Sequence, residues 1–362
     1  MTDRIDAEYM ARAIALAKKG LYTTDPNPRV GCVLVKNKQM IAEGWHYRAG
    51  QNHAEIEALA KIDEAAGATA YVTLEPCSHQ GKTGPCSDAL IKAGIKRVVI
   101  AMQDPNPLVS GAGIKKLQAA GIEVVCGVLE QDAKALNPGF IKRMQQGLPF
   151  IQSKLAMSLD GRTAMASGES KWITSAASRQ DVHRLRAQSS AVLTGINTIL
   201  ADDPLLNARV DFDVQQPVRV VLDSQLRIPL TAKILADKSS PVWIFTCSRN
   251  SEKIQALKDA GATLFIQSDK LARPDLSVVF KTLAEQQINQ VWVEAGATLN
   301  GALLDSGLVD EWLVYMAPCV LGDSGRGLFH LPGLENMAER KSLLFKQIRH
   351  VGPDLKLTLT QA

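Results

Sequence analysis

The spacing of apolar residues along the first part of the chain predicts alternating helices and strands. Met10, Ala13 and Ile14 fall on one face of a helix over 6–19, which Gly20 can terminate. Short apolar runs bounded by polar turns predict strands, and the turn at 36–39 makes a hairpin. The expected strands are 30–35, 40–44, 69–74, 97–102 and 122–128, and the later helices begin near Asn52 and Cys86 and cover 113–120 and 131–146.

The alternation ends at Gly147-Leu148-Pro149 and then starts again, which predicts a domain boundary there. A helix is expected over 175–187, with Ser175 as its N-cap, and another after Gly296. Alternating helices and strands are typical of α/β domains, so both halves are assigned to that class. The expected strands of the second half are 151–157, 191–194, 218–223, 242–247, 290–294, 312–316 and 355–359, the last two antiparallel.

Length and charge limit the possible classes of protein. A chain of 362 residues is too long for one ordinary core, so we expect two domains, 1–147 and 148–362. Basic and acidic residues number 41 and 37, and no basic run is interleaved with aromatics, which argues against a nucleic-acid partner. No apolar run approaches the ~20 residues that cross a bilayer, and the first residues lack an export signal. We therefore expect a cytoplasmic protein without a membrane partner.

Six cysteines in a chain of this length do not indicate a disulfide framework. Four lie in apolar runs and are expected in the core: Cys32, Cys126, Cys247 and Cys319.

The other two cysteines, Cys77 and Cys86, can bind one zinc ion together with His53. Three protein ligands leave the fourth position of a tetrahedral site open for a reactive water. Glu55, two residues after His53, can carry protons for that water. A His-x-Glu followed by Pro-Cys and a second Cys is typical of zinc-dependent nucleobase deaminases. We therefore expect one Zn²⁺ with three protein ligands and Glu55 as the catalytic residue.

A closed structural zinc site is the main alternative. His79 lies between the two cysteines and can supply a fourth protein ligand, which would block the water position. The protein would then be a zinc-stabilised binding module without activity. Glu55 argues against this alternative, because a structural site does not need a carboxylate beside its ligand.

The loop between the cysteines resembles that of one family, the bifunctional deaminase/reductase of riboflavin biosynthesis. It has eight residues, 78–85, where the general deaminase motif has two. The resemblance rests on Pro-Cys-Ser-His-Gln-Gly-Lys-Thr-Gly-Pro-Cys at 76–86, Asn-Pro-Arg-Val-Gly at 27–31 and Gly-Trp-His at 44–46. Gly84 replaces a proline of the family pattern.

The resemblance covers the first 150 residues. It implies a cytidine-deaminase-like, three-layer α/β/α domain with a mixed sheet. It also implies a substrate pocket lined by Asn27, His46, His79 and Lys82. On local grounds alone, Asn27 also fits a turn before Pro28, and Lys82 fits a solvated loop charge.

The second half has no Gly-x-Gly-x-x-Gly fingerprint, so a Rossmann domain is not expected. Its motifs at 154–161, 167–174, 185–187, 198–209 and 294–296 are similar to the reductase half of the same family. This resemblance implies a dihydrofolate-reductase-like α/β domain that binds NADPH. The implied NADPH contacts are Ala156, Trp172, Thr198, Asp202, Gly296, Ala297, Thr298, Leu299, Asn300, Gly301 and Ala302, and the implied substrate contacts are Lys154, Ser170, Arg186, Leu206, Arg209 and Glu294.

Two of these residues also suit the chemistry. Arg186 and Arg209 can form charge-assisted hydrogen bonds with a ribose phosphate, although on local grounds both fit solvated cations. Lys154 or Asp202 is a candidate for proton transfer in the reduction. Trp172 and Leu206 also fit ordinary packing positions.

The resemblance implies two consecutive reactions on a small phosphorylated pyrimidine. The first is hydrolytic deamination of 2,5-diamino-6-(5-phosphoribosylamino)pyrimidin-4-one, and the second is NADPH-dependent reduction of the ribosyl group. A homo-oligomer is implied as well, a dimer through the reductase domain. The rival hypothesis is a cytidine or nucleic-acid deaminase fused to an unrelated reductase, against which the long loop and the missing basic groove argue.

Overall fold

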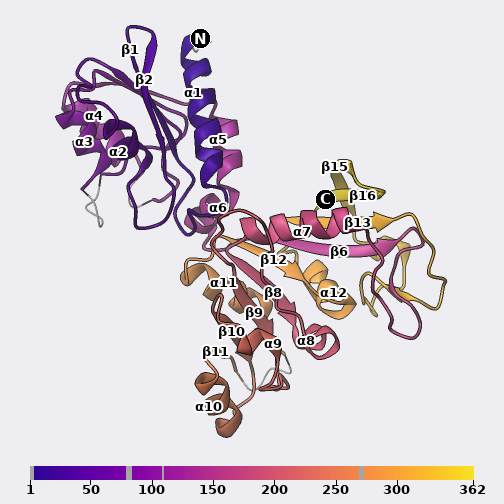
Figure 1. Ribbon diagram of the computed structural model, residues 1–362. Coiled ribbons are helices and arrows are strands. Elements are labelled where there is room, and N and C mark those ends of the chain that lie inside the picture. Colours follow the sequence, from indigo (N-terminus) through magenta and orange to yellow (C-terminus); the bar gives the residue numbers. More distant parts are fainter. Residues whose placement is uncertain (1–3, 79–83, 108–109, 269–272) are drawn as a thin grey trace. The chain divides into compact units, whose positions relative to one another are not determined.

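The computed structural model describes residues 4–78, 84–107, 110–268 and 273–362 (Figure 1). The chain divides into two compact units, Met1–Gly147 and Leu148–Ala362. Within the described ranges, no helix combines the length and the apolar character needed to cross a membrane.

The first unit is built on a five-stranded mixed sheet in the order β2-β1-β3-β4-β5. Strand β1 is antiparallel to both of its neighbours, whereas β3, β4 and β5 run parallel. The strands cover β1 Gly31–Lys36, β2 Gln39–Trp45, β3 Thr69–Val72, β4 Arg97–Ile100 and β5 Glu123–Cys126.

Helices cover both faces of this sheet because its strands are apolar on both sides. Successive residues of a strand point to opposite faces, so Cys32 and Leu34 pack in one core and Val33 and Val35 in the other. The first core lies against α2, α3 and α4, and the second against α1, α5 and α6. The helices are α1 Arg4–Ala17, α2 Ala54–Leu59, α3 Cys86–Lys92, α4 Ala112–Ala119, α5 Glu130–Leu136 and α6 Pro138–Gln146.

The helix expected over 131–146 is in fact two helices. Pro138 cannot donate a backbone hydrogen bond and is the first residue of α6. The helix is therefore interrupted at Asn137. The Asn137 carboxamide accepts from the Arg29 N–H (2.8 Å) and donates to the Arg29 carbonyl (3.0 Å). These two hydrogen bonds hold the loop of Asn27 and Arg29 against the connection between α5 and α6.

The second unit contains a nine-stranded sheet in the order β11-β10-β9-β8-β12-β6-β13-β16-β15. The strands from β11 to β13 are parallel, and β16 and β15 add an antiparallel edge. The strands cover β6 Phe150–Ser158, β8 Ala191–Gly195, β9 Val218–Leu222, β10 Val242–Thr246, β11 Ala262–Ile266, β12 Gln290–Glu294, β13 Glu311–Ala317, β15 Leu343–Val351 and β16 Asp354–Gln361. A separate ribbon pairs β7 Arg162–Ala164 with β14 Arg326–Gly327.

Helices again cover both faces. Val279 and Leu283 of α11 and Leu303 of α12 pack on one face, whereas Val182 of α7 and Ile199 of α8 pack on the other. The helices are α7 Ala176–Gln188, α8 Ile196–Asp202, α9 Lys233–Ala236, α10 Ser251–Asp259, α11 Leu276–Glu285 and α12 Ala297–Ser306. The prediction of Ser175 as the N-cap of α7 is confirmed, since its side chain accepts from the Ser178 N–H.

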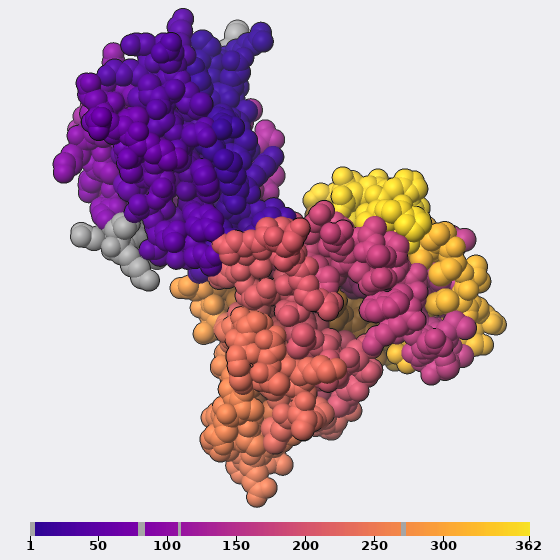
Figure 2. Space-filling model, viewed as in Figure 1, coloured from indigo at the N-terminus to yellow at the C-terminus, as the bar shows by residue number. Residues whose placement is uncertain are grey.

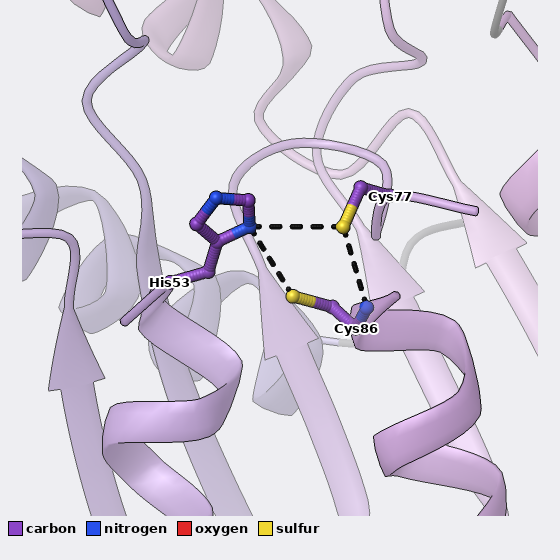
Figure 3. A group of neighbouring side chains, drawn as sticks. All are labelled: His53, Cys77 and Cys86. Atoms are coloured by element: carbon purple, nitrogen blue, oxygen red, sulfur yellow. Dashed lines mark hydrogen bonds between the residues drawn. The ribbon is translucent and has the colours of Figure 1, made fainter. Parts of the chain in front are cut away.

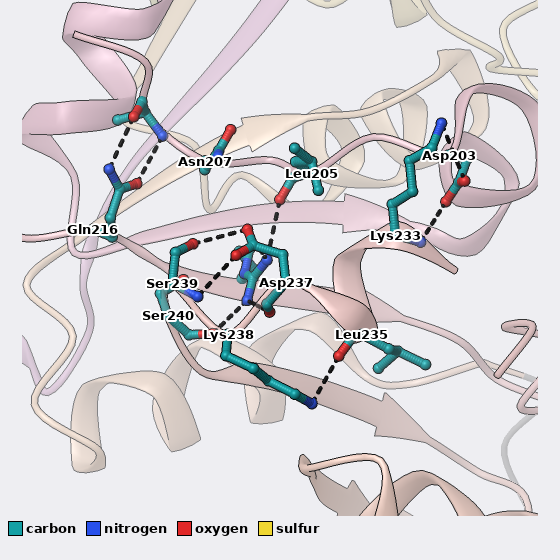
Figure 4. A network of polar contacts seen from close by, with 12 residues as sticks. Asp203, Leu205, Asn207, Gln216, Lys233, Leu235, Asp237, Lys238, Ser239 and Ser240 are labelled. Atoms are coloured by element: carbon teal, nitrogen blue, oxygen red, sulfur yellow. Dashed lines mark hydrogen bonds and ion pairs between the residues drawn. The ribbon is translucent and has the colours of Figure 1, made fainter. Parts of the chain in front are cut away.

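A buried cation ties the loop before β10 to the sheet (Figure 4). The Arg219 side chain on β9 is fully buried and forms an ion pair with Asp237 (3.0 Å). It also donates to the carbonyl oxygens of Asp237 (2.8 Å) and Ser240. The ion pair and the hydrogen bonds compensate for much of the free energy that is lost when the Arg219 guanidinium leaves water.

Two expectations about cysteines are wrong. Cys126 is exposed because β5 is an edge strand, and Cys319 is only partly buried, whereas Cys32 and Cys247 do lie in the interior. An apolar run in the sequence therefore does not guarantee that a residue is buried when its strand lies at the edge of a sheet.

Candidate active sites

The three predicted zinc ligands lie together at one end of the first sheet (Figure 3). His53 precedes α2, Cys77 follows β3, and Cys86 is the first residue of α3. The His53 Nδ1 lies 3.7 Å from the Cys77 Sγ and 3.3 Å from the Cys86 Sγ. Tetrahedral zinc with ordinary Zn–S and Zn–N bonds places such atoms about 3.6 Å apart. Both distances are close to that value, so the group is suited to hold zinc.

Local contacts favour the thiolate form of Cys77. A hydrogen bond from the Cys86 thiol lowers the pKa of the Cys77 thiol against the opposing effect of burial, and His53 acts in the same direction, whereas the same hydrogen bond and burial raise the pKa of the Cys86 thiol. The backbone N–H of Cys86 also donates to the Cys77 Sγ (3.3 Å). Zinc binds the thiolate rather than the thiol, so one of the two sulfurs already favours the form that binds a metal.

Glu55 lies in the first turn of α2 and is 3% exposed. Its burial raises the pKa of the carboxyl to about 7. A carboxyl that titrates near neutrality suits a group that must both take up and release a proton. The helix expected to begin near Asn52 has His53 as its N-cap, and the His53 side chain forms no capping hydrogen bond.

Asn27 and His46 lie beside the zinc ligands. The His46 Nδ1–H donates to the Asn52 carbonyl (2.9 Å), which leaves Nε2 to accept from the Asn27 amide (3.1 Å). The rings of His46 and His53 meet edge to face, with centroids 5.3 Å apart. His79 and Lys82 lie outside the described residues. The alternative that His79 is a fourth protein ligand is therefore not tested by the structure.

Glu75, the residue before the Pro-Cys motif, belongs to this site although no role was predicted for it. Its buried carboxylate accepts four backbone N–H bonds of 2.9–3.2 Å, from Asp104, Gly111, Gly113 and Ile114. The last two belong to the first turn of α4, where an anion is favourable. Because Glu75 precedes Pro76-Cys77, these bonds also fix the position of the zinc ligand.

A buried cluster of charges lies where β12 ends in the second unit. Arg186 and Glu294 form a two-pronged ion pair at 2.5 and 2.8 Å, and Trp292 donates to Glu294 (2.9 Å). Burial raises the pKa of Glu294, but Arg186 and Lys154 oppose it and hold the value at about 2. For Lys154, burial lowers the pKa and Glu294 counteracts the change. The structure thus brings three predicted substrate contacts together.

The connection after α8 contains Leu206 and Arg209. Leu206 is 2% exposed and has a backbone φ of 55°, in the left-handed region that non-glycine residues rarely adopt. Arg209 is exposed and contacts His183. Two residues expected near the substrate thus lie within one short segment.

The segment around Ser170 is exposed. Trp172 is 70% exposed, and the Arg179 guanidinium lies 4.4 Å from the centre of its ring. Lys171 forms an ion pair with Asp202 (2.9 Å), which connects this segment to α8. Trp172 is therefore not a core aromatic, the alternative that local packing allowed.

Helix α12 begins at Ala297, directly after its N-cap Gly296, where the chain turns out of β12. The buried Asn300 side chain accepts from the Ser153 hydroxyl (2.7 Å) and donates to the Ala295 carbonyl (2.9 Å). A Cβ at Gly301 would lie 2.1 Å from the His330 carbonyl oxygen. Asn300 and Gly301, two of the predicted cofactor contacts, therefore pack inside the unit. Within 296–302, the exposed residues are Gly296, Thr298 and Ala302.

Comparisons with known proteins identify both units. The model of the RibD C-terminal domain matches residues 149–357, and the model of the cytidine and deoxycytidylate deaminase zinc-binding region matches residues 3–102. The riboflavin biosynthesis protein RibD of Escherichia coli strain K12 is 52% identical over 370 residues, which cover 99% of this chain and 100% of that protein. The chain belongs to the RibD family.

Solved RibD structures share the whole fold. Acinetobacter baumannii RibD is 48% identical, covers 99% of both chains and superposes with a TM-score of 0.92. A Thermotoga maritima diaminohydroxyphosphoribosylaminopyrimidine deaminase/5-amino-6-(5-phosphoribosylamino)uracil reductase is 35% identical over 99% of both chains, with a TM-score of 0.88. The predicted fold classes are thereby confirmed, a cytidine-deaminase-like domain followed by a dihydrofolate-reductase-like one.

Membership of the RibD family makes this chain a bifunctional enzyme of riboflavin biosynthesis, with hydrolase and oxidoreductase activities. Its cofactors are zinc in the deaminase and NADPH in the reductase. His183 and Gln216, which hold the segment of Arg209, are absent from the predicted set. No sequence motif marks them, because their role rests on side-chain hydrogen bonds to residues 8 and 26 positions away in irregular backbone.

Proposed function

We propose that residues 1–147 deaminate 2,5-diamino-6-(5-phosphoribosylamino)pyrimidin-4-one and that residues 148–362 reduce the ribosyl group of the product with NADPH. The observation that supports this most directly is a buried Glu55 beside the group of His53, Cys77 and Cys86. The RibD relative from Thermotoga maritima is named for these two reactions and spans the same length.

In the deaminase, His53, Cys77 and Cys86 hold the metal and Glu55 moves the protons. Zinc, when bound there, would lower the pKa of a water molecule towards neutrality and so supply a hydroxide nucleophile. Glu55 takes one proton from the attacking water and delivers it to the ring nitrogen, and it then moves the second proton from the new C–OH group to the departing amine, which leaves as ammonia. Asn27 and His46 orient the pyrimidine, supported by their hydrogen bond to each other and their position beside His53.

In the reductase, the residues of this chain position the open ribose against the cofactor. NADPH, when bound, supplies the hydride to C1 of the ribose. Arg209 is exposed and can bind the substrate phosphate, and Lys154, Arg186 and Glu294 form the buried floor of the site. Ser170 contacts the substrate and Trp172 and Asp202 contact the cofactor, supported by their exposed positions, and the start of α12 offers backbone N–H groups to a cofactor phosphate.

The decisive experiment follows ammonia release and NADPH oxidation in one tube with purified pyrimidine substrate. We expect ammonia to be released first and NADPH to be consumed in a 1:1 ratio to it. Cytidine and single-stranded DNA serve as comparison substrates and should release no ammonia. Ammonia release from cytidine alone would favour the rival deaminase, and no release from any substrate would favour a zinc-stabilised binding module.

We also propose that the enzyme is a cytoplasmic homodimer joined through its reductase unit. Strand β15 forms one edge of the nine-stranded sheet, and Leu344, Phe345 and Ile348 on it are 56–63% exposed. Figure 2 shows this C-terminal region at the surface, in yellow. A zinc site with two thiolates also suits a reducing compartment. Sedimentation of the wild type and of Phe345→Asp tests the dimer, which the charge should dissociate.

A further inference from the structure

The segment 206–209 has no regular secondary structure, yet three side chains hold its backbone. Arg186 donates to the Asn207 carbonyl (3.0 Å). The Gln216 carboxamide accepts from the Ala208 N–H and donates to the Ala208 carbonyl, both at 2.9 Å (Figure 4). The amide thus takes the place that a neighbouring strand would occupy in a sheet.

His183 holds the next residue. Its Nδ1 lies 3.2 Å from the Arg209 N–H, and its Nε2 lies 2.9 Å from Nη2 and 3.2 Å from Nε of the Arg209 guanidinium. Burial and the charges of Arg186 and Arg209 lower the pKa of His183 to about 4, so the ring is neutral at neutral pH. A neutral imidazole accepts at one nitrogen, so the tautomer decides whether His183 holds the backbone or the guanidinium.

The conformation of the segment gives a second, independent argument. Leu206 adopts a positive φ of 55° while its side chain is almost completely buried. A strained backbone of this kind persists only where its surroundings determine it, and such sites concentrate at ligand contacts. The bonds to Asn207, Ala208 and Arg209 supply that constraint immediately after the strained residue.

We propose that Gln216 and His183 are positioning residues that fix Arg209 to meet the phosphate of the reductase substrate. The inference rests on the proposed function, in which Arg209 binds that phosphate. Arg209 is exposed, and a long cationic side chain in solvent loses considerable rotamer entropy when it binds. Gln216 fixes the backbone beside Arg209, and His183 fixes either the Arg209 N–H or one edge of its guanidinium, and this ordering before binding reduces that loss.

The test compares the steady-state kinetics of Gln216→Leu in the full-length enzyme with those of the wild type. We expect KM for the phosphorylated reductase substrate to rise about tenfold, equivalent to ~1.4 kcal/mol, because both bonds to Ala208 are lost. The value of kcat and KM for NADPH should stay within about twofold. His183→Leu should raise the same KM. The adjacent Gln215→Leu is the matched control, since Gln215 forms no side-chain hydrogen bond within the part of the chain that the structure describes.

A substrate without the phosphate separates positioning from general damage. With the dephosphorylated ribosylaminouracil, Gln216→Leu and the wild type should have equal KM values. An equal rise for both substrates, or an unchanged KM for the phosphorylated one, would overturn the proposal. Arg209→Ala tests the proposed function separately: if it leaves the phosphorylated KM unchanged, the phosphate role itself is wrong. In an Arg209→Ala background, Gln216→Leu should add little, because the group that it positions is gone.

Discussion

Replacing Glu294 with Gln should strongly destabilise the reductase unit. The substitution keeps the size of the side chain but removes its charge, so Arg186 loses a buried partner. The two side chains are 12% and 15% exposed, and Lys154 adds a second cation beside them. Breaking a buried ion pair on one side is costly because the remaining charge has left water without compensation.

Two estimates of the size of this effect agree. The pKa of Glu294 is about 2 instead of 4.5, which corresponds to ~3 kcal/mol of stabilisation for the ionised form. Removing one partner of a buried pair costs about 3–5 kcal/mol. For a unit of this size, ~3 kcal/mol lowers the melting temperature by about 6–12 °C.

The pH dependence follows from the lowered pKa. The stabilisation by Glu294 is fully present above pH 4.5 and is lost as the pH falls towards 2, through the pKa of the folded state. In Glu294→Gln the free energy of unfolding should not show this decrease between pH 4.5 and pH 2.

Urea unfolding followed by tryptophan fluorescence measures the loss of stability. Four of the five tryptophans, including the buried Trp292 and Trp312, belong to the second unit and report on it. Glu285→Gln, at an exposed position at the end of α11, is the control and should unfold like the wild type. A change below ~1 kcal/mol in Glu294→Gln would show that the ion pair does not stabilise the fold.

Three further predictions concern the deaminase. Glu55→Ala should retain zinc but slow ammonia release by at least a factor of about 10², while NADPH oxidation with the deaminated substrate continues; loss of both activities would argue against separate sites. Cys77→Ser should lose zinc, and a normal metal content by elemental analysis would refute its role as a ligand. Glu75→Gln should destabilise the first unit by about 3 kcal/mol, since bonds to a charged acceptor are among the strongest; unchanged thermal unfolding and zinc affinity would contradict this.

Periodicity predicted most of the helices and strands but not all of their limits. Strand β15 was missed because seven of its nine residues are exposed, so it shows no alternation between a buried and an exposed face. Helix α10, strand β11 and helix α11 were also missed. The helices of this region have clear side-chain caps, Asn250 and Asp275, and these signals could have located them.

The sites were predictable to the extent that their residues lie close together in short motifs. The group of His53, Cys77 and Cys86 assembles as its spacing implied. Arg186 and Glu294 were each expected to contact substrate, but their bond to each other was not expected, since 108 positions separate them. Pairing at this distance depends on the order of strands in the sheet, which a motif does not contain.

The position of β6 in its sheet affects how the protein is made. This strand is the first of the second unit, yet its two neighbours are β12 and β13, which begin at residues 290 and 311. During synthesis β6 therefore emerges from the ribosome long before either partner, whereas β1 and β2 can pair at once as a hairpin. Strands that wait unpaired fold slowly and are exposed to aggregation. The second unit, rather than the first, should then depend more on chaperones in the cell.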